Sequence, residues 1–254
     1  MLVRRYDMHC HLDFFADTEK TVELVAESGN RFLSVTVTPE GYSRAARLFA
    51  SSSQVRVGLG LHPWWIADGR CTVDDLVAFE ALAKHAAFVG EVGLDFGKRC
   101  AGSESVQREA FGRVARACVD GAAQVISIHA VKAEDEVLDV LQRTGCLDES
   151  SCILHWFSGS SEQLARASKA GCYFSVGPRM LASKRGREYV KAIPRDKLLV
   201  ETDAPSEPAS SMEFQACEQL LSETLVQLDE ILGNDILSQV ERTSAELFGS
   251  LTLD

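Results

Sequence analysis

Two histidines separated by one residue, His9 and His11, close the first apolar run of the sequence. If this run forms a β-strand, side chains two positions apart point to one face roughly 7 Å apart, so both imidazoles can bind one divalent cation. Cys10 points to the other face, which argues against this thiol as a ligand. Alone, the pair is equally compatible with two surface or capping histidines, so the rest of the chain must decide.

Further candidate ligands recur where later apolar runs end: His62, Glu91, His129, His155 and Asp203. Even without His62, four histidines and two carboxylates are the wrong set for one structural zinc ion, which has four ligands and usually includes cysteine. They suit two cations about 3.5 to 4 Å apart, an arrangement that activates water for hydrolysis and commonly shares a bridging carboxylate. Glu91 is the predicted bridge. The sixth histidine, His85, falls at the end of a predicted helix and is expected to be structural.

The elements that must position these residues are strands alternating with helices. The expected strands lie within residues 6–13, 31–37, 55–61, 87–95, 124–129, 151–157, 171–178 and 196–205. The expected helices cover residues 17–29, 42–51, 73–85, 103–121, 133–144, 162–170, 183–192, 213–232 and 235–248. Eight strand–helix units predict parallel connections and an α/β fold, a (β/α)8 TIM barrel with an extra C-terminal helix. Because the carboxyl ends of barrel strands converge on one face, the candidate ligands should meet there.

Composition sets broad limits on the protein. The 254 residues are 46% hydrophobic and 25% charged, as in an ordinary globular protein, and no linker or low-complexity break divides them, so we expect a single barrel domain over residues 1–254. The net charge of -11 argues against a protein that coats nucleic acid by bulk electrostatics. Screening over about 8 to 10 Å still allows local cations, or a metal, to dominate at one mouth of the molecule.

The cellular location is suggested by the absence of membrane-spanning and secretory segments in the sequence. No apolar run is long enough to span a membrane and the start has no secretory h-region, so we expect a cytoplasmic protein without membrane contact. Eight cysteines without any C-x-x-C pair are expected to be reduced and mostly buried.

Six motifs occur in the same order as in a known family. Residues 7–13 (DMHCHLD), 60–63 (GLHP), 90–95 (GEVGLD), 127–129 (SIH), 155–160 (HWFSGS) and 201–205 (ETDAP) resemble those of the TatD-like metal-dependent deoxyribonucleases, within the amidohydrolase-like barrels. Each motif is modest by itself, but six in order across nearly the whole chain are specific. The resemblance implies a (β/α)8 barrel, two or three divalent ions (Zn, Mg or Mn) and hydrolysis of DNA phosphodiesters, often as a 3'-5' exonuclease on single strands.

The resemblance also implies roles for individual residues. Carried over position by position, it makes His9, His11 and Asp203 ligands of one metal, Glu91 the bridge, and His129 and His155 ligands of the second. Glu91 and Asp203 are the expected catalytic carboxylates, and Asp203 is the natural acceptor of the proton from the attacking water. Glu201 points to the same strand face as Asp203, so it supports the metal site from behind, helps to hold the metal, or forms a structural salt bridge.

Contacts to a phosphate-bearing substrate are expected around this centre. His62 is a candidate phosphate contact, and Lys132 and Arg179 are the cations expected near the same face. Trp156, like Trp64 and Trp65, lies where an indole could stack on a base, although burial at the barrel rim would explain it equally.

One segment departs from the family pattern. Many members carry an arginine, a lysine and an Asn-Pro pair after the last aspartate, whereas residues 205–211 (PSEPASS) are short and lack those cations. We therefore expect a short single-strand end, a nucleotide-sized phosphoester or a substrate delivered by a protein partner, rather than long duplex DNA. Compact members of the family occur in bacterial multi-gene antiviral defence systems, an association that this sequence permits.

Two other functions have to be weighed. Related barrels hydrolyse amides, cyclic amidines and lactones with the same His-X-His opening, often with a carboxylated lysine as the bridge. Here Glu91 occupies the bridging place and no lysine ends the fourth strand, which favours the phosphodiesterase. A third hypothesis is a scaffold subunit of a larger assembly, against which the complete ligand set argues.

Overall fold

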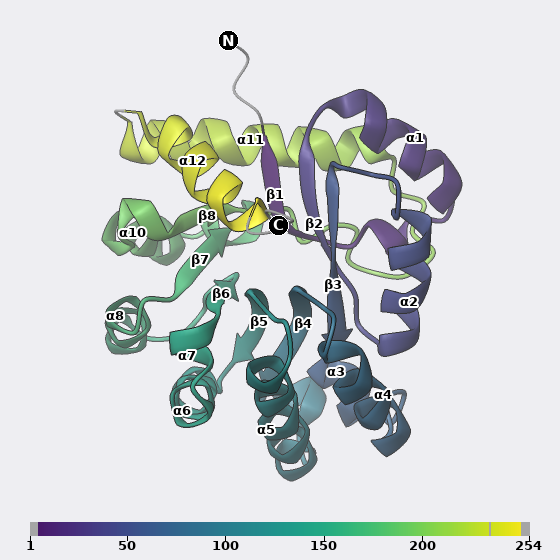
Figure 1. Cartoon of the computed structure of the whole chain (residues 1–254). Helices are drawn as coiled ribbons and strands as arrows, with labels where there is room; N and C mark the ends of the chain where they lie inside the picture. Colours follow the sequence, from purple (N-terminus) through teal and green to yellow (C-terminus); the bar gives the residue numbers. More distant parts are fainter. Residues whose placement is uncertain (1–4, 234, 250–254) are drawn as a thin grey trace.

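Eight strands run parallel in the order of the chain and curve into a barrel inside a ring of helices (Figure 1). This computed structural model describes residues 5–233 and 235–249. The strands are β1 (Tyr6–Cys10), β2 (Arg31–Val35), β3 (Val55–Leu61), β4 (Phe88–Asp95), β5 (Val125–Val131), β6 (Ser151–His155), β7 (Tyr173–Val176) and β8 (Leu198–Val200). The predicted (β/α)8 barrel is therefore confirmed.

The longer helices follow the strands as expected. They are α1 (Thr18–Ser28), α2 (Pro39–Leu48), α4 (Val73–Ala83), α5 (Glu104–Asp120), α6 (Glu134–Thr144), α8 (Ser161–Lys169), α10 (Lys184–Ala192), α11 (Phe214–Leu232) and α12 (Ile236–Phe248). Their ends obey local rules. In α1, for example, the Asp17 side chain caps the first turn and Gly29 ends the helix with a φ of 69°. Across the described part of the chain, no helix combines the length and apolarity that a bilayer crossing needs.

Differences from the expected elements lie at helix starts and in short turns. Helix α2 begins at Pro39 rather than at the predicted Tyr42, because Thr38 caps it and proline is favoured in a first turn. Six short elements were not predicted, since three to five residues are too few for a helical period. They are α3 (Pro63–Ala67), α7 (Cys146–Glu149), α9 (Pro178–Leu181), and the 3-10 turns η1 (Leu12–Phe14), η2 (Lys98–Cys100) and η3 (Arg195–Lys197).

The barrel is closed between its first and last strands by residues just beyond β8. Asp203 N–H donates to the His9 carbonyl (2.9 Å), and His11 N–H donates to the Ala204 carbonyl (3.0 Å). The buried Asp7 carboxylate accepts hydrogen bonds from both the backbone N–H (3.1 Å) and the hydroxyl (2.6 Å) of Thr202. Burial raises the pKa of Asp7 to about 7 despite these bonds. These hydrogen bonds form a seam between β1 and the residues that follow β8. The seam brings His9 and His11 close to Asp203.

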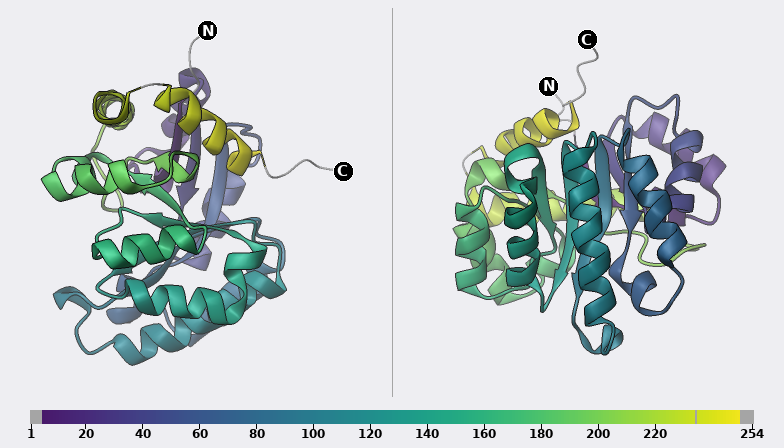
Figure 2. Two further views of the ribbon diagram at one scale, coloured as in Figure 1. Left: turned by 90° about the vertical axis from the view of Figure 1, so that its left-hand side faces the viewer. Right: turned by 60° about the horizontal axis from the view of Figure 1, so that its bottom comes forward.

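The amino-terminal end of the barrel is filled by apolar side chains and covered by α12. Met8, Leu33 and Leu199, which are fully buried, belong to the cluster there. The Phe248 ring of α12 packs edge-on against Tyr6 of β1, with ring centroids 5.7 Å apart. Figure 2 shows α12 lying at the end of the barrel where β1 begins. The extra helix therefore seals the face opposite the candidate ligands, which keeps the polar chemistry at the other end.

A side chain at Gly93 of β4 would collide with the neighbouring strand β5 beside the candidate site. Gly93 has a φ of 143°, and a Cβ at this position would overlap the carbonyl oxygen of its partner His129. Only glycine fits both restrictions. The backbone of β4 is thus held against β5 where Glu91 and His129 have to meet.

We expect Gly93→Ala to lower the free energy of unfolding by at least about 3 kcal/mol, because the unfavourable φ and the overlap with the His129 carbonyl add. Gly171→Ala is the matched control, since Gly171 also has a positive φ (83°) but no atom within 4 Å of the added Cβ. It should cost only about 1 kcal/mol. Urea denaturation followed by circular dichroism measures both, and equal losses would contradict the close approach.

Candidate metal centre

The carboxyl ends of the strands bring the sequence-predicted ligands into one cluster. A cavity of about 780 Å³ opens at this face, and its lining includes His11, His62, Glu91, His129, His155 and Asp203. His9 is fully buried and contacts Glu91 and Asp203 from beneath. His85, expected to be structural, follows α4 at the surface and is not part of the lining.

The Glu91 carboxylate lies at the centre of five imidazoles. Its Oε1 is 2.8 Å from both His129 Nδ1 and His155 Nε2, and 3.0 Å from His62 Nε2. Its Oε2 is 3.5 Å from His9 Nε2 and 3.6 Å from His11 Nε2. Burial alone would raise the pKa of Glu91, but the facing histidines outweigh it and hold the pKa well below its usual value. Glu91 is therefore an ionised carboxylate whose two oxygens face separate sets of histidines.

His9 and His11 are each held by the ring nitrogen that faces away from the cavity. His9 Nδ1 is 2.8 Å from the Ser127 hydroxyl, and His11 Nδ1 is 3.1 Å from the Val35 carbonyl oxygen. Because a carbonyl only accepts, His11 Nδ1 carries a proton and Nε2 is left to face the carboxylates. The two Nε2 atoms lie 3.8 Å and 3.5 Å from Asp203 Oδ1. Such outward hydrogen bonds fix the orientation of metal-ligating histidines.

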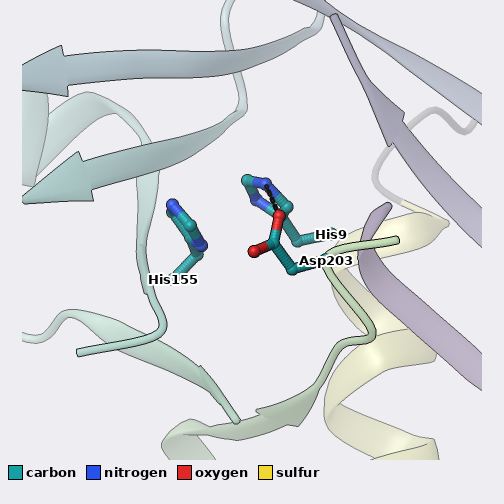
Figure 3. Close-up of side chains that lie close together, drawn as sticks. All are labelled: His9, His155 and Asp203. Carbon is teal, nitrogen blue, oxygen red and sulfur yellow. Dashed lines mark ion pairs between the residues drawn. The ribbon is translucent and has the colours of Figure 1, made fainter. Parts of the chain in front are cut away.

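Figure 3 shows His155 from β6 facing His9 from β1, with the Asp203 carboxylate beside them. The two rings are stacked, with centroids 3.9 Å apart. Burial and the neighbouring His155 lower the pKa of His9 to about 4, so His9 is neutral. Its Nε2 has no hydrogen-bond partner among the described residues.

A buried ring nitrogen without a hydrogen-bond partner is unfavourable, and a cation bound to it would remove that cost. The orphaned Nε2 belongs to two groups whose ligand atoms lie within 4.8 Å of one another: His9, His11 and Glu91, and His9, His155 and Asp203. Imidazole and carboxylate are also the donors that catalytic zinc and manganese sites use. The residues present therefore fit divalent cations.

Asp95, at the end of β4, supports His129 and was not predicted as a site residue. Its Oδ2 lies 3.2 Å from His129 Nε2 and also accepts a hydrogen bond from the indole N–H of Trp64. Burial by itself would lower the pKa of His129, but bonds with Asp95 and Glu91 raise it to about 9. Asp95 thereby directs His129 Nδ1 at Glu91. The signals in the sequence were its place at the end of a strand and its place in the motif of residues 90–95.

His62 faces the centre as a hydrogen-bond donor. Its Nδ1 accepts the backbone N–H of Trp64 at 3.0 Å, so the proton of the neutral ring is on Nε2, which points at Glu91. His62, Glu91 and His129 also form a third group whose possible ligand atoms lie within 4.8 Å of one another. A cation on His62 Nε2 would move the ring proton to Nδ1, where it would face the backbone N–H of Trp64, so this tautomer disfavours His62 as a metal ligand.

Glu201 lies behind the cluster rather than in it. Its Oε1 accepts the backbone N–H of Trp156 at 3.0 Å, its Oε2 is bonded to the Ser175 hydroxyl, and the same oxygen is 3.8 Å from His155 Nδ1. Burial, together with the charge of Asp203, raises the pKa of Glu201 well above its usual value. The hydrogen bonds of Glu201 thus go to Trp156 and Ser175, and none reaches His155.

The cations at the cavity mouth differ from those expected. Arg179 Nη1 is 3.3 Å from Asp203 Oδ2, and its guanidinium lies over the Trp156 ring, 4.7 Å from the centroid. Lys132 follows β5 but is exposed and does not line the cavity. Arg70 and Arg99 do line it, and neither was predicted, because both come from connections whose path the sequence does not reveal.

A parallel (β/α)8 barrel with clustered histidines and carboxylates at its carboxyl face defines the class of metal-dependent hydrolases. Within that class, a family model described as TatD related DNase matches residues 6–249. The chain belongs to this family, which confirms the resemblance found in the motifs.

Individual relatives are similar over most of the chain. The uncharacterised metal-dependent hydrolase YabD of Bacillus subtilis is 28% identical, and the alignment covers 96% of this chain and 98% of that protein. The 3'-5' ssDNA/RNA exonuclease TatD of Escherichia coli is 27% identical over 76% of this chain and 74% of its own length. The crystal structure of YjjV, a TatD homologue from Escherichia coli, superposes with a TM-score of 0.81 at 24% identity, covering 98% of this chain and 99% of that one, which supports the fold.

We expect Asp95→Asn to weaken manganese binding by about 10- to 100-fold, because His129 loses the carboxylate that orients it. Isothermal titration calorimetry measures the affinity. Asp68→Asn is the control, since Asp68 is exposed at the mouth and its hydrogen bonds go to Arg70 rather than to a histidine. Equal affinities for the two variants would show that Asp95 does not position a ligand.

Proposed function

We propose that this protein is a metal-dependent phosphodiesterase of the deoxyribonuclease type, which hydrolyses the ends of DNA strands, with 3'-5' action on single strands. The observation that carries the proposal is the buried Glu91 carboxylate, whose two oxygens face separate sets of histidines at the floor of one cavity. The relative named as a 3'-5' ssDNA/RNA exonuclease supports the direction and the strandedness.

The clustered residues would hold two divalent cations, or up to three. The candidate metals are zinc, magnesium and manganese. His9, His11 and Asp203 would hold one, His129 and His155 the other, and Glu91 would bridge them. When bound, such cations polarise a phosphoryl oxygen and lower the pKa of water.

The chain's own residues would supply the remaining functions. Asp203 is partly exposed to the cavity, so its carboxylate can accept the proton of the attacking water. Arg179, beside Asp203, would bind the scissile phosphate, and the Nε2–H of His62 would donate to one of its oxygens. The Trp156 indole beneath Arg179 holds that guanidinium in place.

The charges around the cavity favour a phosphoester over an amide or lactone substrate. Arginine side chains line it, and its lining includes no lysine that could be carboxylated to form the bridge used by related amidohydrolases. A scaffold role is disfavoured because the complete set of predicted metal ligands is present and lies together in the structure. A cavity of about 780 Å³ also fits a short strand end better than a duplex.

The proposal extends to the cellular setting. We place the activity in the cytoplasm and, with protein partners that deliver the substrate, in a bacterial multi-gene defence system. Both statements rest on the motif resemblance and on the sequence, not on contacts in the structure.

We expect Glu91→Gln and Asp203→Asn each to reduce metal-dependent release of nucleotides from 3'-labelled single-stranded DNA by at least about 1000-fold, because each removes a charge shared with the cations. Glu80→Gln is the matched control, since Glu80 pairs with Arg113 away from the cavity, and it should retain full activity. Equal product release by wild type and the two site variants would refute the assigned centre.

We expect manganese titration of the metal-free wild type to reveal two sites, and Asp203→Asn to lose one of them while His129→Ala loses the other. The reason is that Asp203 and His129 lie on opposite sides of Glu91. Elemental analysis after gel filtration counts the ions. Retention of both ions in either variant would contradict the proposed ligand sets.

A further inference from the structure

All three tryptophans of the chain line the cavity that contains the candidate ligands, and an arginine lies over each of their rings. The distances from guanidinium carbon to ring centroid are 4.0 Å for Arg99 over Trp64, 4.0 Å for Arg70 over Trp65 and 4.7 Å for Arg179 over Trp156. The proposed function uses Arg179 alone. The other two pairs have no role in it.

Arg99 differs from the other two arginines in its charge environment. Arg70 is bound to Asp68, with Nη2 2.6 Å from Oδ2, and Arg179 lies 3.3 Å from Asp203. Within residues 5–233 and 235–249, no carboxylate oxygen lies within 4.0 Å of the Arg99 guanidinium. Arg99 is also exposed, so its charge faces the solvent of the cavity mouth.

The position of Arg99 is nevertheless well defined. Its partner Trp64 is fixed by the hydrogen bond from the indole N–H to Asp95, and Asp95 in turn binds His129. Trp64 also packs edge-on against His129, with ring centroids 5.8 Å apart. A stack on an anchored indole restrains a long side chain that would otherwise be mobile. Arg99 is therefore linked to His129 through Trp64.

Arg99 and Arg179 approach the cluster from different sides. His129, to which Arg99 is connected, contacts Oε1 of Glu91. Asp203, which Arg179 contacts, pairs with His9 and His11, and these face Oε2. A phosphate bound between the cations near Arg179 thus leaves Arg99 available to a second anion further along the cavity.

We propose that Arg99, held on Trp64, forms a second phosphate subsite, which binds the phosphate next to the scissile one in a nucleic acid strand. Arg99 forms no direct ion pair with the described residues, so its charge can attract a phosphate, and its planar fork matches two phosphate oxygens. The preferred substrate is then a strand end with at least two phosphates rather than an ester with one. This inference rests on the proposed function and names the part of the substrate that the metal cluster does not touch.

The test compares the dinucleotide TpT, which has one phosphate, with the trinucleotide TpTpT, which has two, in the presence of manganese. We expect the kcat/KM of the wild type to favour TpTpT by about tenfold, mainly through a lower KM. Arg99→Ala should lose most of this preference, and Arg99→Lys should recover part of it, because lysine retains the charge but not the planar fork.

Lys98→Ala is the matched control, since Lys98 is the neighbouring exposed cation and does not line the cavity. It should keep the wild-type preference. The subsite is refuted if Lys98→Ala and Arg99→Ala lower the preference equally, which would indicate bulk charge, or if the wild type cleaves both substrates equally well. If the wild type cleaves both substrates equally well, the subsite is refuted, but the cleavage of TpT still supports the proposed phosphodiesterase activity. Cleavage of neither substrate would refute the function and the subsite together.

Discussion

The structure depends on one buried carboxylate. Glu91 is almost completely removed from water, and an ion in that position is costly unless opposite charges or hydrogen bonds surround it. Five histidines from four other strand ends and their following turns do so, and none of these contacts is local in sequence. The cluster consequently requires the whole barrel. A set of groups this crowded is stable only if positive charge, from protons or from cations, lies among the carboxylates.

Residues without any chemical role hold the arrangement in place. Ser127 and Val35 fix the two histidines of β1 from behind, Asp95 fixes His129, and Gly93 lets β4 lie against β5. These contacts determine which ring nitrogen faces the cavity, and so which atoms can bind a cation. The same contacts continue outward, since Asp95 also anchors the indole that carries Arg99. The contacts that orient the clustered histidines and those that position Arg99 at the cavity mouth thus belong to one network.

The sequence alone predicted the barrel and the residues that meet at its floor, because both follow from periodicity and from strand ends. His129 and His155 could be placed beside Glu91 once their strands were recognised. Contacts between distant side chains were beyond prediction: nothing in the spacing pairs Asp7 with Thr202 or stacks Arg99 on Trp64. The paths of the segments that connect strands to helices could not be predicted either. Lys132 follows a strand as a site residue would, yet it is exposed outside the cavity lining.

The seam between the first and last strands has a consequence for the order in which the protein is made. His9 and His11 lie at the end of the first strand, whereas Asp203 and the Thr202 that binds Asp7 follow the last strand, so the ribosome makes them after all eight strands. Until β8 has been synthesised and has paired with β1, the cluster lacks a carboxylate and the barrel lacks its closure. The full set of clustered side chains therefore cannot assemble before the last strand of the barrel has been made.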